Sequence, residues 1–135
     1  TNSYDEALFA YFMDSQLMLV DLSGNKQAVG PSGLISSIDL SPDGNYIMVD
    51  LIKKPFSYLV PASRFPYDVE IWDSKGNKVK TLAQIPLDEV RPTGFDATVK
   101  GPRSISWRAD KGASLYWTEA FWLKQQMFSR REYKV

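Results

Sequence analysis

Cysteine and histidine are both absent from this sequence of 135 residues. Without cysteine the chain can form no disulfide, no thiolate nucleophile and no cysteine-ligated zinc or iron site. Without histidine it lacks the usual general base of serine and cysteine hydrolases, so the Ser-His-Asp and Cys-His catalytic sets are excluded. We therefore expect no catalytic residue, no metal site and no cofactor in this chain.

An excess of charge of one sign is also absent, because 16 lysine and arginine residues balance 16 aspartate and glutamate residues. A neutral total removes the main electrostatic argument for a nucleic acid or an anionic membrane as partner. No apolar run approaches the roughly 20 residues of a membrane-spanning helix, and no signal-peptide pattern is present. We therefore expect neither nucleic acid nor membrane as a partner.

The charges are unevenly distributed within that neutral total. Residues 1–52 contain Lys26 as their one cation beside seven acids, so residues 53–135 carry the compensating positive charge. Two halves of opposite net charge favour packing of one half on the other, or of two copies head to tail. Uneven solvated charge explains the pattern equally well.

A hydrophobic fraction of 44% predicts a folded core, and the length suits a single domain. Residues 4–13 have the pattern of a short helix, with Ser3 and Glu6 at the spacing of a capping box. Leu8, Phe9, Phe12 and Met13 recur at intervals of four and predict one apolar stripe along it.

After this helix a unit of strand, glycine-containing turn and strand recurs four times. The turns are at residues 23–25, 41–44, 73–76 and 108–112, and the flanking segments alternate apolar and polar residues. The first and third turns resemble each other, as do the second and fourth. The sequence therefore predicts an antiparallel all-β chain with an internal repeat.

Alternation of two hairpin types is typical of the four-stranded blades of a β-propeller. Residues 1–135 would then form a single partial propeller, with a half blade at 17–29, a full blade at 35–83, a half blade at 103–119 and an atypical tail at 121–135. Propellers close with about 4 to 8 blades of about 40–50 residues. This chain is too short for that, so we expect open blade edges and self-association through them.

The segment 53–67, which reads KKPFSYLVPASRFPY, resembles the propeller of the glutamyl-endopeptidase branch of the prolyl-oligopeptidase family of serine peptidases. Similar motifs follow in the same order from about residue 4 to residue 120. They are YDEALF at 4–9, SPDG at 41–44, VEIWD at 69–73, GFDA at 94–97, GPRSISWRAD at 101–110 and LYWTEA at 115–120.

The resemblance implies that the catalytic serine, aspartate and histidine lie in a separate hydrolase domain of the relatives. This chain has no histidine and no Gly-x-Ser-x-Gly motif, so we expect a non-catalytic, truncated propeller fragment that retains a surface for substrate gating and recognition. The resemblance also implies a periplasmic or exported location. The alternative is a free-standing, oligomerising module that binds proteins or peptides.

Lys54, Tyr58, Arg64 and Tyr67 are the candidate substrate-binding residues, because they lie on or next to the long connection at 53–66. In a peptidase that prefers acidic side chains, Arg64 flanked by aromatic residues suits a bidentate contact with a substrate carboxylate. A peptide is therefore the expected ligand. The simpler interpretation is that the aromatic residues pack the loop onto its blade and the cations are solvated.

Two further segments support weaker hypotheses. The connection at 84–101 contains Asp88, Glu89, Arg91 and the run at 94–96, and a solvated loop explains it better than an acid–base pair or a Ca²⁺ site. The tail at 121–135 is basic and aromatic and departs from the family pattern. An amphipathic helix would explain its composition, and a truncated or frame-shifted reading frame explains it better. Trp72, Trp107 and Trp117 are expected to pack between blades.

Overall fold

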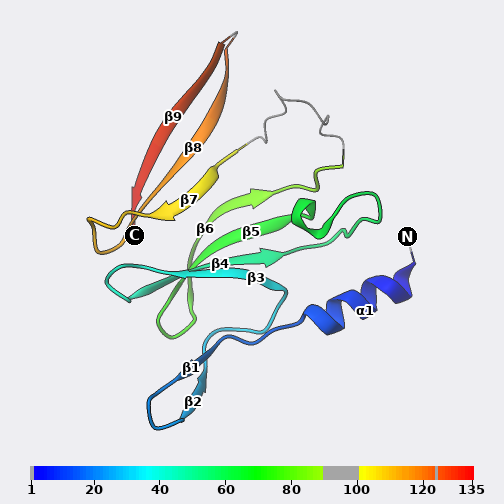
Figure 1. Ribbon diagram of the computed structural model, residues 1–135, viewed down its shortest axis with the longest axis vertical. Coiled ribbons are helices and arrows are strands. Elements are labelled where there is room, and N and C mark those ends of the chain that lie inside the picture. The colour runs from blue at the N-terminus through cyan, green and yellow to red at the C-terminus, as the bar shows by residue number, and fades with distance from the viewer. Residues whose placement is uncertain (1, 90–100, 124) are drawn as a thin grey trace.

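The computed structural model describes residues 2–89, 101–123 and 125–135, which form antiparallel strands and one short N-terminal helix (Figure 1). The all-β prediction with one helix is thus confirmed. No helix in these ranges is long and apolar enough to span a membrane. The elements are α1 (Ser3–Met13), β1 (Met18–Val20), β2 (Lys26–Ala28), β3 (Ile35–Leu40), β4 (Tyr46–Ile52), the 3-10 turn η1 (Ala62–Arg64), β5 (Tyr67–Asp73), β6 (Lys78–Ile85), β7 (Arg103–Trp107), β8 (Ser114–Leu123) and β9 (Gln125–Lys134).

The strands form three sheets that follow one another along the chain. The first pairs β1 with β2, the second is a meander in the order β3-β4-β5-β6, and the third has the order β7-β8-β9; all pairings are antiparallel. Figure 1 shows the four-stranded sheet between the two smaller ones. The sheets do not close into a barrel within the described residues.

The C-terminal tail, for which an amphipathic helix was considered, instead forms strand β9. Its register with β8 runs from Ser114 opposite Lys134 to Leu123 opposite Gln125. The unpaired edge of β8 offers backbone donors and acceptors that a strand satisfies and a helix does not. Tyr133 packs on the core and lies under Lys80, whose Nζ is 3.9 Å from the ring centroid. The end of the tail is therefore integrated into the fold.

Helix α1 is capped one residue earlier than the sequence pattern indicated. The backbone N–H of Tyr4 donates to the side chain of Asn2 at 3.0 Å, and the N–H of Glu6 donates to the Asn2 carbonyl at 3.1 Å. Asparagine caps helices as well as serine does. Ser3 is therefore the first helical residue, and the predicted capping box is wrong.

Phe9 carries the packing of this helix. Its ring contacts those of Phe56 and Phe65 edge to face, with centroids 4.8 and 5.7 Å apart, and these two rings stack on each other at 5.6 Å. The predicted apolar stripe is otherwise poorly covered, since Phe12 is 73% exposed. The helix therefore docks on the segment between β4 and β5 mainly through one side chain.

The two similar hairpin turns at Asp21 and Asp73 use the same hydrogen bonds. In each, one carboxylate oxygen of the aspartate accepts two backbone N–H groups, and the other oxygen accepts the side-chain amide of the asparagine four residues later, Asn25 or Asn77. These bonds hold the pKa of Asp21 and of Asp73 below the usual value, the asparagine side chain contributing most. The internal repeat thus extends to atomic detail.

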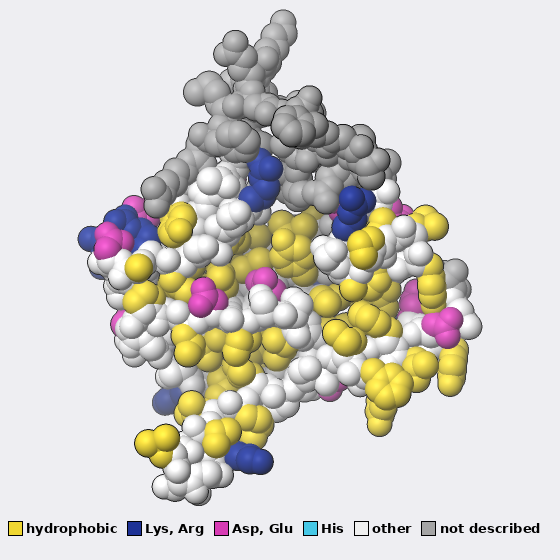
Figure 2. Space-filling model, in the orientation of Figure 1, with side chains coloured by type: hydrophobic (Ala, Val, Ile, Leu, Met, Phe, Trp, Pro, Cys, Tyr) yellow, Lys and Arg dark blue, Asp and Glu magenta, His cyan; other side chains and the backbone are white. Residues whose placement is uncertain are grey.

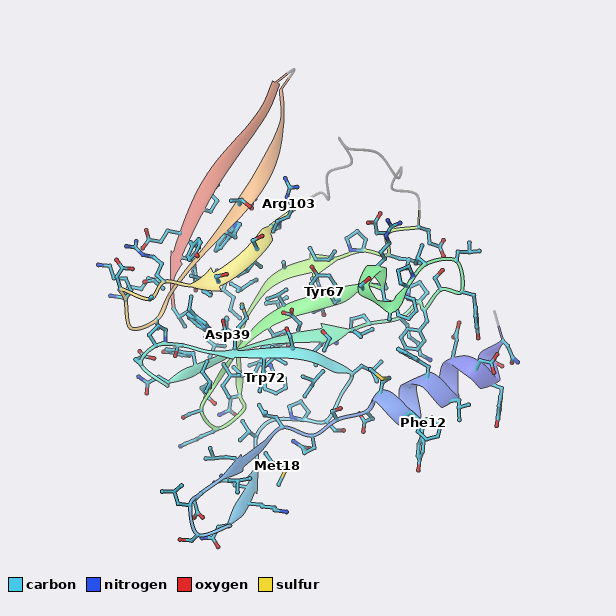
Figure 3. All side chains as sticks on the ribbon, viewed as in Figure 1. Phe12, Met18, Asp39, Tyr67, Trp72 and Arg103 are labelled. Atoms are coloured by element: carbon cyan, nitrogen blue, oxygen red, sulfur yellow. The ribbon has the colours of Figure 1, made fainter. Side chains whose placement is uncertain are left out.

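The first sheet packs on the second where two glycines meet. A Cβ on Gly76 would lie 1.9 Å from the backbone nitrogen of Gly30, and one on Gly30 would lie 2.6 Å from the ring of Trp72. Trp72 is 1% exposed and fills this interface (Figure 3) together with Val29, which follows β2, and with buried side chains of β4. Close approach of the hairpin at Gly76 is what lets the tryptophan be buried.

The opposite face of the four-stranded sheet is covered by the third sheet. Trp107 and Leu115 are buried there with the inward side chains of the central strands. Two hydrogen bonds join the sheets: Trp107 Nε1 donates to the Asp39 carbonyl at 3.1 Å, and the N–H of Asp43 donates to the Gly112 carbonyl at 3.1 Å. The three tryptophans pack between sheets, as expected. Trp72 belongs to the core on the first face, and Trp107 and Trp117 belong to the core on the opposite face.

Substitution of Gly76 by alanine should lower the free energy of unfolding by about 2–5 kcal/mol, because a positive φ costs about 1–2 kcal/mol and overpacking costs about 1–3 kcal/mol. Gly24 is the matched control, since its φ is also 87° and a Cβ added to it would meet nothing within 4 Å. Gly24→Ala should cost only the part due to the positive φ, about 1–2 kcal/mol. Equal losses in chemical denaturation would contradict the packing of the two sheets.

Substitution of Phe9 by alanine should cost about 1–2 kcal/mol, since it removes two edge-to-face ring contacts. Phe12→Ala on the same helix should stay within about 0.5 kcal/mol, as exposed positions do. Thermal unfolding of both variants measures the difference. If Phe9→Ala is no more destabilised than Phe12→Ala, the helix is not docked in solution.

Candidate functional site

The connection between β4 and β5, residues 53–66, lies at one end of the four-stranded sheet. Its base is closed by a hydrogen bond of 2.7 Å from the N–H of Lys53 to the Pro66 carbonyl. Phe56 and Phe65 are buried within it. The loop is therefore held by its own aromatic residues, with helix α1 as their packing partner.

The four predicted binding residues lie at different places on this loop. Lys54 is exposed, with its Nζ 5.8 Å from the centroid of the Phe56 ring. Arg64 ends the 3-10 turn η1 and is half-buried. No hydrogen bond, ion pair or ring contact joins any two of Lys54, Tyr58, Arg64 and Tyr67 in the described part of the chain. The structure therefore does not by itself assemble them into one site.

The backbone of Arg64 is held by two hydrogen bonds. Its backbone carbonyl accepts the N–H of Asp88 at 3.1 Å, and its own N–H donates to the Pro61 carbonyl at 2.9 Å. These bonds fix the backbone, while the guanidinium makes no hydrogen bond or ion pair with any described residue. A guanidinium on a fixed backbone can receive a carboxylate with two parallel hydrogen bonds.

Tyr58 is turned toward the start of helix α1. Its hydroxyl donates to the Asn2 carbonyl at 3.5 Å. Desolvation and the negative charge of Asp5 raise the pKa of Tyr58 above its ordinary value. This hydroxyl therefore stays protonated at neutral pH and serves the contact between helix and loop.

Tyr67 begins β5 and borders a small hollow that sequence reasoning did not identify. The hollow has a volume of about 250 Å³. Asp50 lies in it on β4, and the Ser37 hydroxyl donates to the Asp50 carboxylate at 2.8 Å. The described lining residues come from β3, β4, the 53–66 loop and β5: Ser36, Ser37, Asp50, Ile52, Ala62, Ser63, Phe65 and Tyr67.

Burial raises the pKa of the Asp50 carboxyl above its ordinary value, and the hydrogen bond from Ser37 partly offsets this effect. Burial also raises the pKa of Tyr67, with the charge of Asp50 adding to it. The sequence did contain a signal for this site, since Asp50 is the one charged residue in the apolar strand 46–52. A lone acid in such a strand requires an explanation.

Glu70 is a carboxylate that is more deeply buried than Asp50, at 6% exposed, and its role is structural. It accepts hydrogen bonds from Trp72 Nε1 at 2.8 Å and from Lys78 Nζ at 3.4 Å. A hollow of about 650 Å³ lies beside it, lined by the segment 31–34 and by residues of the second sheet and its β5–β6 turn. Lys53, which also borders this hollow, is 3.7 Å from Asp68. The charges here are thus paired within the protein.

The second connection contributes Asp88 and Glu89 to the described residues. The Ser57 hydroxyl donates to the Glu89 carboxylate, and the Asp88 N–H bonds to the 53–66 loop. Arg91 and the run at 94–96 lie outside the described residues. No group of three acids suited to a metal ion occurs in the part of the chain that the structure describes. These contacts tie the segment after β6 to the 53–66 loop.

Comparison with curated proteins finds two long relatives. The chain is 44% identical over 118 residues to a probable chloroplastic glutamyl endopeptidase of Oryza sativa subsp. japonica, and 42% identical over 118 residues to one of Arabidopsis thaliana. The match covers 87% of this chain and only 13% and 12% of those proteins. No family model matches the chain, and no solved structure is found to match it.

The ordered motifs noted in the sequence and this level of identity both indicate homology to glutamyl endopeptidases. An identity above 40% that extends over most of a chain is far beyond what a shared fold alone produces. The chain spans about one eighth of the length of its curated relatives. Over that stretch, this chain is homologous to proteins named probable glutamyl endopeptidases, as a fragment of a peptidase of that family would be.

Proposed function

We propose that this chain is a non-catalytic part of a glutamyl-endopeptidase-like peptidase, a β-propeller segment that gates and recognises peptide substrates. The observation that carries the proposal is its identity with one stretch of much longer peptidases, combined with a sequence that has neither histidine nor a nucleophile motif. An exported location belongs to the same proposal and is supported by the resemblance alone.

The stacking of the sheets supports the propeller part of this proposal. In a propeller each four-stranded meander is covered on both faces by its neighbours. The β3–β6 sheet has this arrangement, because one face packs on Leu17 and Val29, which flank β1 and β2, and the other packs on the third sheet. The SPDG hairpin of one sheet also bonds to the hairpin at Gly112 of the next. Repetition of this contact would extend the array in both directions.

The recognition surface is the 53–66 loop, and the ligand is a peptide with an acidic side chain. Arg64 supplies the guanidinium for a substrate carboxylate, and Lys54 adds positive charge on the same loop. Tyr58 and Tyr67 supply aromatic surface on and beside the loop. Each of these residues is at least partly exposed, which recognition of a ligand requires.

A second function, self-association, is favoured by the outer surface of the first sheet. Met18, Leu19 and Val20 are 42%, 59% and 54% exposed, and Figure 2 shows hydrophobic side chains gathered at this end of the molecule. An edge strand with apolar side chains on its surface is a template for pairing with another chain. Light scattering tests this function directly, and a strict monomer that unfolds cooperatively would contradict it.

Substitution of Arg64 by alanine should weaken binding of a glutamate-containing peptide about tenfold, because a hydrogen bond to a charged group contributes roughly 1.5–3 kcal/mol. The same peptide with glutamine in place of glutamate should bind the protein and the variant equally. Lys75→Ala, at an exposed cation in the turn after β5, is the control and should leave both affinities unchanged. Fluorescence anisotropy with labelled peptides gives these constants, and an Arg64→Ala variant that still prefers glutamate refutes the role of Arg64.

The chain should not cleave a chromogenic peptide that carries glutamate at the scissile position. No histidine is present to act as general base, so the rate should equal that of the buffer. Turnover that copurifies with the 135-residue chain and is blocked by a serine-directed inhibitor would contradict the non-catalytic assignment.

A further inference from the structure

We propose that the hollow around Asp50 is a binding subsite for the cationic side chain of a peptide, a lysine ammonium or an arginine guanidinium. This subsite is separate from the predicted carboxylate contact at Arg64. It rests on the proposed function only in taking the ligand to be a peptide.

The charge of Asp50 is the first argument. Its carboxylate is half-buried on β4, and its one side-chain hydrogen bond within the described part of the chain comes from the Ser37 hydroxyl. No lysine or arginine pairs with it there, whereas Glu70 and Asp68 each have a lysine partner. A half-buried carboxylate with no cation among the described residues is less favourably placed than a paired one, and such groups gather at functional sites.

The backbone beside Asp50 supplies the second argument. The pairing of β3 with β4 shifts register between Ile35 and Ser37, which is a β-bulge at Ser36. The bulge places two consecutive hydroxyls at the acid: Ser36 donates to the Asp50 carbonyl at 3.2 Å, and Ser37 donates to the carboxylate. Bulges are common beside binding sites because they redirect a side chain.

The lining of the hollow determines which cation fits. Ile52, Phe65 and Ala62 provide apolar lining, and Ser63 and Tyr67 are further polar residues of the lining. A lysine or arginine places methylene groups along apolar surface and its charged end on polar groups. A volume of about 250 Å³ is below the range of about 300–1,000 Å³ typical of whole small-molecule sites, and it suits one side chain.

A bare metal ion fits the hollow less well. Ca²⁺ takes about 6–8 oxygen ligands with several carboxylates, and Asp50 is the one carboxylate among the described lining residues. Burial raises the pKa of Asp50, and the one opposing effect among the described residues is the hydrogen bond from Ser37.

The test uses three blocked pentapeptides that differ only at the central residue, which is lysine, arginine or uncharged norleucine. NMR titration of the 135-residue chain follows the backbone amide signals of Ser37, Asp50 and Tyr67. The lysine or the arginine peptide should shift these signals and bind about tenfold more tightly than the norleucine peptide, as a charge-assisted hydrogen bond to the carboxylate would provide. The stronger of the two identifies the cation.

Asp50→Asn should abolish this preference, because it removes the charge and keeps the shape. Asp39→Asn is the matched control: Asp39 is an exposed acid on β3, the strand that pairs with β4, and its loss changes net charge equally. This control should keep the preference. Equal affinity of the three peptides, or equal losses in both variants, overturns the proposal.

Thermal unfolding at pH 7 separates binding from structure. Because burial raises the pKa of Asp50, the ionised carboxylate lowers the stability of the folded state at any pH above that raised value. Asp50→Asn should therefore be at least as stable as the unchanged protein. A clear loss of stability in this variant alone would identify Asp50 as a structural residue and refute the subsite. The peptides contain no glutamate, so this result is independent of the Arg64 experiment.

Discussion

The burial of the four-stranded sheet on both faces is the constraint on which the rest of this structure depends. One face is sealed by Trp72 at the approach of Gly76 to Gly30, and the other by Trp107 and Leu115 of the third sheet. The first sheet has no comparable cover on its outer side within the described residues, as the exposed side chains of β1 indicate. The middle sheet is thus stabilised by its contacts with the sheets before and after it. Both candidate binding regions lie at one end of β4 and β5, so their positions depend on this burial.

Much of this fold could be predicted from the sequence because the turns are stabilised by residues within the turns themselves. Asp21 and Asp73 each begin a turn closed by the asparagine four residues later, and the glycines between supply the positive φ. The helix is also predictable, although Asn2 and not Ser3 caps it. Strand β9 is not, because a basic, aromatic tail satisfies helical and strand patterns alike. Its pairing is decided by the edge of β8, which is a tertiary constraint.

The candidate site is less predictable for a related reason. Arg64 and Tyr67 stand out in and beside a long loop, so sequence reasoning finds them. Asp50 and Ser37 come from different strands and meet through the register of β3 and β4 and a bulge at Ser36, which no local pattern encodes. The simpler interpretation of the loop packs its aromatic residues on the blade, whereas Phe56 and Phe65 form a cluster with Phe9 of the helix. These contacts could not be predicted from the sequence because the residues that make them are far apart along the chain.

Native-state hydrogen exchange tests the shared burial of the three sheets most directly, because it reports the opening free energy of each strand separately. The account predicts that the amides of Val49 and Ile71 in the middle sheet, Leu115 in the third sheet and Val29 beside the first exchange with similar, high opening free energies, as one cooperative unit. Rapid exchange at Val29 and Leu115 while Val49 and Ile71 stay protected would show a sheet that is stable alone, and would contradict the account.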